Sequence, residues 1–147
     1  LIQGYRQNLA RARASAAKLS RRPKVYFEEW DDPMISGIQW VSELIEIAGG
    51  DDICADLATE KGAAGRTITN ERVIAADPDI IIGSWCGKPV DIDAIRNRPG
   101  FDQVTAVREN RIYEMDPAII LQPGPAALTD GLAALCELIQ GGSTAGH

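Results

Sequence analysis

The segment PDIIIGSWCGKPVD (residues 78–91) decides the fold class. Its three consecutive isoleucines, Ile80–Ile82, show no alternation of apolar and polar side chains, which is typical of a parallel strand covered on both faces. Directly behind this strand come Trp85, Cys86 and Lys88, which are an aromatic ring, a thiol and a cation in place of an ordinary polar connection. The segment therefore predicts a buried parallel strand with a candidate binding site at its carboxyl end.

Helical and extended patterns alternate along the rest of the chain. Short apolar runs between chain breakers predict strands, and apolar residues three or four positions apart predict helices. The expected strands are 24–28, a very short one near 53, 79–83 and 110–115; the expected helices are 1–20, 38–48, one from about 70 to 77, a short one within 90–101, and 124–140. The segments 31–37 and 116–125 are expected to be loops. This order predicts an α/β fold, an open parallel sheet with helices on both faces in a single Rossmann-like lobe.

Composition excludes several classes of protein. The chain has 147 residues and a net charge of −6, so it lacks the basic surface of a general nucleic-acid-binding protein. No run of 18 apolar residues is present, so no transmembrane segment is expected. The cysteines, Cys54, Cys86 and Cys136, lie far apart, and His147 is the single histidine, so no metal site is expected.

The connections that follow the strands are expected to meet at one edge of the sheet. The carboxyl ends of parallel strands lie together, and ligands of such folds bind outside that edge. There Trp30 and Trp85 are predicted to present rigid faces that form half of a clamp for a large, flat ligand. The candidate ligand-binding residues at this edge are Glu29, Trp30, Arg66, Trp85, Cys86, Lys88 and Gln122.

The same residues allow simpler interpretations. Each tryptophan can cap the core from a loop, and the four carboxylates within residues 28–32 can be solvated loop acids. Cys86 has no histidine partner apart from the terminal His147, so we expect no catalytic residue and no enzyme.

Several motifs, taken in order, resemble class III periplasmic-type substrate-binding proteins of ABC importers, which carry cobalamin, haem and ferric siderophores. ERVIAADPDIII (71–82) resembles the family's helix–strand segment, and WVSELIEIAGGDDI (40–53) resembles its preceding helix. RNRPGFDQVTAVRENRIYEMD (96–116) is similar to a further family signature. The stretch 28–50, together with SWCGKP (84–89) and LQPGP (121–125), looks most like the cobalamin-binding subgroup.

The resemblance implies a domain organisation. Residues 1–20 would be the end of a long helix that joins two lobes, 21–141 the C-terminal ligand-binding lobe, and 142–147 a disordered tail. Glu71 stands at the position of the glutamate that docks on arginines of the permease subunits. One departure is Gly65, where cobalamin-binding members can have a tryptophan.

The resulting hypothesis is a substrate-binding component of an ABC importer, without a cofactor, that carries cobalamin or an iron chelate such as haem or a siderophore. We expect a periplasmic or extracytoplasmic location, or a cytoplasmic one if the complete protein has no signal peptide. Two alternatives stay open. One is a doubly wound enzyme domain of the nitrogenase or chelatase kind, and the other is a cytoplasmic cobalamin-binding regulatory protein.

Overall fold

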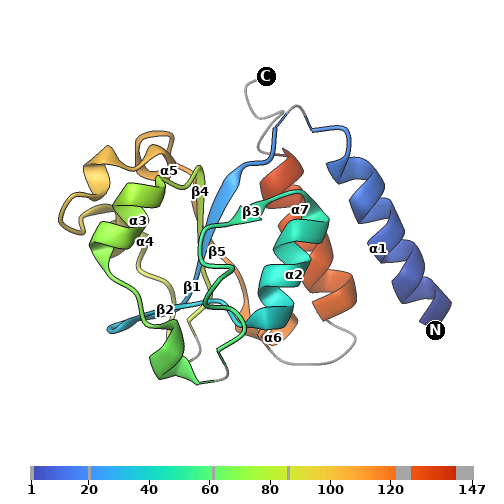
Figure 1. Cartoon of the computed structure of the whole chain (residues 1–147), viewed down its shortest axis with the longest axis horizontal. Coiled ribbons are helices and arrows are strands. Elements are labelled where there is room, and N and C mark those ends of the chain that lie inside the picture. Colours follow the sequence, from blue (N-terminus) through green and yellow to red (C-terminus); the bar gives the residue numbers. More distant parts are fainter. Residues whose placement is uncertain (1, 20, 61, 86, 122–126, 142–147) are drawn as a thin grey trace.

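The computed structural model describes residues 2–19, 21–60, 62–85, 87–121 and 127–141. Helices and strands alternate around one sheet (Figure 1). The α-helices are α1 (Ile2–Ala16), α2 (Gln39–Ala48), α3 (Asn70–Ala76), α4 (Ile92–Arg96), α5 (Thr105–Arg108), α6 (Pro117–Ile120) and α7 (Leu132–Gly141). The strands are β1 (Lys24–Asp31), β2 (Met34–Ser36), β3 (Asp51–Asp52), β4 (Ile80–Gly83) and β5 (Ile112–Glu114). Shorter helical turns are η1 (Ala63–Arg66), η2 (Phe101–Gln103) and η3 (Ala127–Gly131).

The sheet confirms the predicted α/β class. Strands β3, β1, β4 and β5 lie in that order and pair in parallel, with Val25 of β1 opposite Ile80 of β4 and Ile81 of β4 opposite Ile112 of β5. Their carboxyl ends therefore lie at one edge, as the sequence predicts. The sheet is open because β5 and β3 do not meet.

One strand departs from the prediction. Residues 31–37 were expected to be a loop, but β2 folds back on β1 as an antiparallel hairpin arm, with Trp30 opposite Ile35. Met34 and Ser36 are buried in this arm. Both β2 and β3 pair with the same side of β1, β2 near its carboxyl end and β3 near its amino end.

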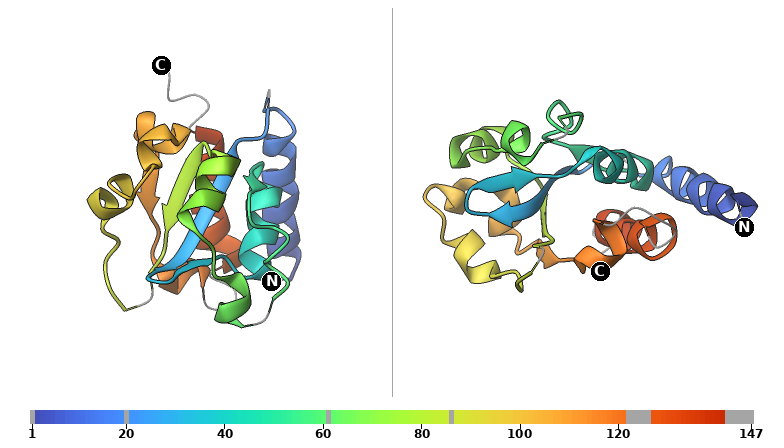
Figure 2. Two further views of the ribbon diagram at one scale, coloured as in Figure 1. Left: turned by 60° about the vertical axis from the view of Figure 1, so that its left-hand side comes forward. Right: turned by 90° about the horizontal axis from the view of Figure 1, so that it is seen from below.

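Helices cover both faces of the sheet (Figure 2). Each face has its own core of buried side chains. Successive side chains of a strand point to opposite faces. Ile80 and Ile82 therefore join a core that includes residues of α1, α2, α6 and α7, while Ile81 joins the core under α3, α4 and α5. This division explains the uninterrupted isoleucines, since both faces of β4 are buried.

The helix ends follow local signals, with some differences. Gly49, at φ 105°, ends α2, and the Thr69 side chain accepts a hydrogen bond from the Arg72 backbone at the start of α3. The helix expected over 1–20 ends at Ala16. The helix expected from 124 becomes α-helical at Leu132, after the η3 turn, and the loop expected over 116–125 contains the short helix α6. The tail 142–147 lies outside the described residues.

Candidate functional site

The candidate site lies where β1 and β4 end. The Lys88 ammonium is 4.7 Å from the centre of the Trp30 ring and 5.2 Å from that of the Trp85 ring. The same nitrogen is 2.9 Å from Oδ2 of Asp31. The structure thus brings together an aromatic pair, a cation and a carboxylate from the end of β1 and from the connection after β4, which are more than 50 residues apart in the chain.

Trp85 does not present the open face that the clamp hypothesis requires. Its side chain is 3% exposed and belongs to the core under α3, α4 and α5. Its Nε1–H donates a 3.0 Å hydrogen bond to Glu28 Oε2. The prediction of two free ring faces is therefore wrong for Trp85, because a polar partner inside the core holds its indole. Trp30 is half-buried and packs at the border of the same core.

Glu28 is the residue whose role the sequence misses most clearly. It is fully buried in β1, and not a solvated loop acid. Arg98 donates to both of its carboxylate oxygens, at 2.7 and 2.8 Å, and the Tyr26 hydroxyl donates at 2.7 Å. Burial, and then the nearby Glu28 charge, raise the pKa of Tyr26 well above its ordinary value. This network fixes the floor of the site, since the same carboxylate holds Trp85.

Glu29 and Arg66 pair with each other. Arg66 Nη1 lies 3.1 Å from Glu29 Oε1 and donates to the Ser36 carbonyl at 2.7 Å. The Ile38 backbone donates to the other Glu29 oxygen at 2.7 Å. Burial raises the pKa of Glu29, and the Arg66 charge opposes this shift. The pair joins the β1–β2 hairpin to η1. Contact of either residue with a ligand stays a prediction.

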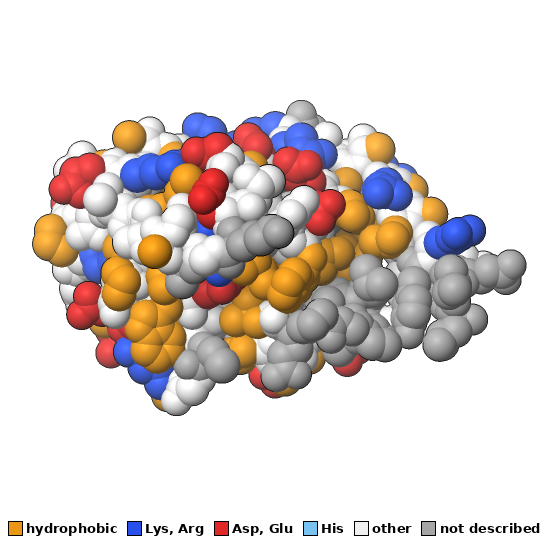
Figure 3. Space-filling model, turned by 60° about the horizontal axis from the view of Figure 1, so that its bottom comes forward, with side chains coloured by type: hydrophobic (Ala, Val, Ile, Leu, Met, Phe, Trp, Pro, Cys, Tyr) orange, Lys and Arg blue, Asp and Glu red, His pale blue; other side chains and the backbone are white. Residues whose placement is uncertain are grey.

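A groove continues from the Lys88 position along the start of α4. Its volume is about 660 Å³, and it is lined by Asp31, Trp85, Lys88, Pro89, Val90, Asp91, Ile92, Asp93 and Ala94. Figure 3 brings this edge of the molecule forward and shows hydrophobic side chains exposed there beside charged ones. Cys86 and Gln122, which the sequence also assigns to the site, lie outside the described residues.

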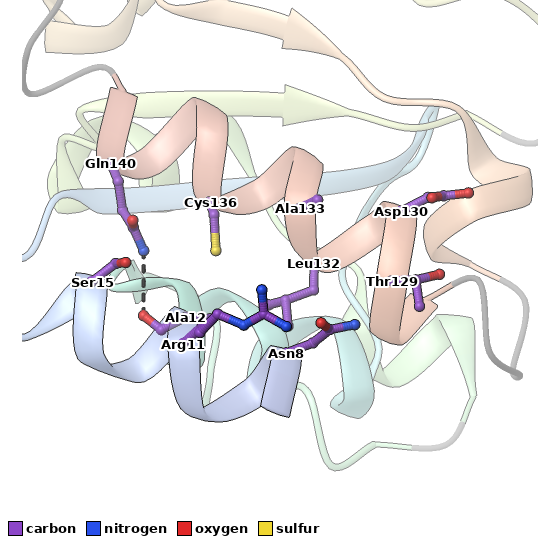
Figure 4. A pocket seen from close by; sticks show the side chains of 10 residues that line it. All are labelled: Asn8, Arg11, Ala12, Ser15, Thr129, Asp130, Leu132, Ala133, Cys136 and Gln140. Carbon is purple, nitrogen blue, oxygen red and sulfur yellow. Dashed lines mark hydrogen bonds between the residues drawn. The ribbon is translucent and has the colours of Figure 1, made fainter. Parts of the chain in front are cut away.

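A second hollow, of about 360 Å³, lies between α1 and α7 (Figure 4). The Gln140 side-chain amide donates to the Ala12 carbonyl of α1 at 3.5 Å and to the Ala48 carbonyl of α2 at 2.7 Å. The lining of this hollow comes from α1, η3 and α7, and includes none of the residues directly after β1 or β4. It therefore belongs to the helix layer and not to the site at the sheet edge.

The described residues offer little for metal or thiol chemistry. Within the described ranges, no group of three or more histidine, cysteine or acidic side chains is placed to hold a metal ion. Burial raises the pKa of Cys54 to about 12, so this thiol stays protonated at neutral pH. No helix in the described part of the chain is long and apolar enough to cross a membrane.

Glu71 lies apart from this cluster. It is exposed in the first turn of α3. Thr67, three residues before the helix begins, forms a bridge with Ile35 of the hairpin. The exposed Glu71 carboxylate is accessible to a partner.

An open, mostly parallel sheet with an aromatic and charged cluster at its carboxyl edge is an arrangement typical of ligand-binding α/β folds. The model of the periplasmic binding protein family matches residues 1–119, and the chain belongs to this family. The residues that carry the resemblance in the sequence lie mostly within this range.

Two curated proteins are similar to this chain in sequence. The chain is 24% identical over 144 residues to YvrC of Bacillus subtilis, an uncharacterised ABC transporter substrate-binding lipoprotein, covering 95% of this chain and 43% of that one. It is 27% identical over 112 residues to a cobalamin-binding protein of Halobacterium salinarum, covering 69% and 30%. The chain thus spans less than half the length of these curated relatives.

A solved structure has the same fold. It is an ABC-type Fe³⁺-hydroxamate transport system protein from Saccharomonospora viridis, with a TM-score of 0.73 and 26% identity. The match covers 93% of this chain and 47% of the other.

Proposed function

We propose that this chain is the C-terminal lobe of an extracytoplasmic substrate-binding protein that delivers cobalamin or a ferric chelate to an ABC importer. The carrying observation is the cluster of Trp30, Asp31, Trp85 and Lys88 at the carboxyl edge of the sheet. An apolar surface with few polar groups suits an extended ligand whose metal is already chelated. In this proposal α1 is the end of the helix that leads to a second lobe.

The described site supports binding rather than chemistry. The half-buried Trp30 ring offers apolar contact, and Lys88 and Asp31 offer one charge of each sign beside the groove. A ligand buried between this edge and a second lobe would stay bound until the permease separates the two lobes. The names of the relatives support cobalamin and iron chelates as the ligands to test first.

A titration tests this function. The 147-residue chain and the protein from the complete reading frame are titrated with cyanocobalamin, haemin and a ferric trihydroxamate, with tryptophan fluorescence as the readout. We expect the complete protein to bind one of these at least about tenfold more tightly, since a second lobe adds contact surface. Trp40→Phe is the control for the fluorescence readout. Trp40 packs on the other core, where its Nε1–H donates to the Ile120 carbonyl, so this tryptophan lies outside the candidate site. Equal affinity in both proteins would contradict the two-lobe proposal.

Docking on the permease is tested at Glu71. Glu71→Arg reverses an exposed charge, and we expect uptake of the ligand to fall about tenfold or more while the affinity for the ligand is unchanged. Uptake is measured in cells that depend on this importer. Glu109→Arg, an equal change at an exposed residue after α5, is the control. Normal uptake with Glu71→Arg would contradict the docking role and favour a protein that works without a permease.

A further inference from the structure

We propose that the Lys88 ammonium occupies the binding position of a ligand group and is displaced when the ligand binds; we call this the placeholder role of Lys88. The position lies between Trp30, Trp85 and Asp31. The ligand group that takes it carries N–H donors. The inference rests on the proposed function and adds to it the chemical group of the ligand that this site recognises. That group is an ammonium or primary carboxamide attached to an apolar body.

The chemistry of the position favours a hydrogen-bond donor. The faces of indole rings attract cations, and a carboxylate accepts charge-assisted hydrogen bonds. Lys88 now satisfies these groups, at 4.7 and 5.2 Å from the two ring centres and 2.9 Å from Asp31 Oδ2. A ligand that brings only acceptor oxygens would leave the Asp31 carboxylate without a donor.

Asp31 has more accepting capacity than Lys88 uses. Its Oδ1 is buried and has no hydrogen-bond partner in the described part of the protein. Buried acceptors without a partner are rare in folded proteins and are costly. From its place on the turn, the Lys88 ammonium contacts Oδ2 alone, whereas an ammonium or carboxamide on a ligand in the groove can direct N–H donors to both oxygens. The position therefore fits a ligand group better than it fits Lys88.

Lys88 is also free to leave. Its turn is anchored before and after it, by the Ser84 hydroxyl on the Met115 carbonyl at 2.7 Å and by the Val90 backbone on Glu114 at 3.0 Å. Between these anchors Gly87 has φ +97°, and a Cβ there would meet nothing within 4 Å. The Lys88 side chain is 42% exposed and can swing into solvent without disturbing the core.

Displacement would open a continuous surface. Lys88 and Asp31 line the groove of about 660 Å³ that continues past Pro89 to the start of α4. Removing the lysine from the ring face joins the Trp30 surface to this groove. An apolar ligand body can then lie along it while the N–H group contacts Asp31.

The test compares Lys88→Ala and Lys88→Met with wild type in the protein from the complete reading frame. Cyanocobalamin, haemin and a ferric trihydroxamate are the probes. We expect Lys88→Ala to lower the dissociation constant about three- to tenfold, because the binding-competent state no longer competes with the lysine. Acrylamide should quench tryptophan fluorescence more in this variant before any probe is added. Lys88→Met keeps the long side chain and should change both values less. Asp31→Asn should weaken binding about tenfold.

Lys18→Ala, at an exposed residue after α1, is the control and should leave both values unchanged. If wild type binds a probe and Lys88→Ala binds it equally or more weakly, the placeholder role is overturned while the proposed function stands. Weaker binding would then make Lys88 a direct contact of the ligand. If neither wild type nor any variant binds a probe, the proposed function fails, and this inference fails with it.

Discussion

Replacing Arg98 by Ala is expected to lower the free energy of unfolding by about 3–5 kcal/mol. The Glu28 carboxylate is fully buried, and Arg98 supplies two of the hydrogen bonds that stabilise its charge. Without the guanidinium, the buried carboxylate keeps two of the side-chain donors that the described residues supply, Tyr26 and Trp85. The measurement is a urea titration followed by circular dichroism and by tryptophan fluorescence.

Two controls separate charge pairing from other losses. Arg108→Ala removes an exposed arginine and should change stability by less than about 0.5 kcal/mol. The double variant Glu28→Gln with Arg98→Met removes both charges and should recover at least half of the loss, because no buried charge is left alone. A double variant as unstable as Arg98→Ala would show that packing of Arg98 on Phe101, and not the ion pair, is what matters.

Replacing Leu135 by Ala is expected to destabilise the protein by about 2–5 kcal/mol. Leu135 is fully buried in α7, within the core shared with α1 and α2. Truncation removes apolar contacts and leaves a cavity that a close-packed layer cannot fill. Thermal and urea unfolding measure the loss, which should appear as a lower midpoint with an unchanged slope.

Leu138 in the same helix is the matched control. It is half-buried against the same core, so Leu138→Ala should cost about half as much as Leu135→Ala. Equal losses at the two positions would contradict the burial of Leu135 and the placing of α7 on this face of the sheet.

Local patterns were enough to predict most of the fold. The isoleucine run of β4 and the helical spacing over 38–48 are signals carried by neighbouring residues, and the structure has both elements. The sequence did not predict β2, because the strand has only three residues and is stabilised by pairing with β1. The helix α6, of four residues, is too short to show a period.

The sequence predicts the place of the candidate residues but not their contacts. Topology alone places Trp30, Trp85 and Lys88 at one edge, and the structure has Lys88 over both rings. That these residues bind a ligand stays a prediction. The partner of Glu28 is 70 residues away, and nothing near either residue in the sequence pairs them. The same long-range network buries Trp85, so its exposure could not be inferred from its place in a connection.

The shared pairing side of β1 has a further consequence for solubility. A long strand with an unpaired side is a template for intermolecular strand addition. On that side, β3 covers the amino end of the aromatic strand β1 and β2 covers its carboxyl end, while the opposite border of the sheet is β5, a strand of only three residues. The hairpin arm that flanks the site thereby also occupies backbone groups of β1 that could otherwise pair with a strand of another chain.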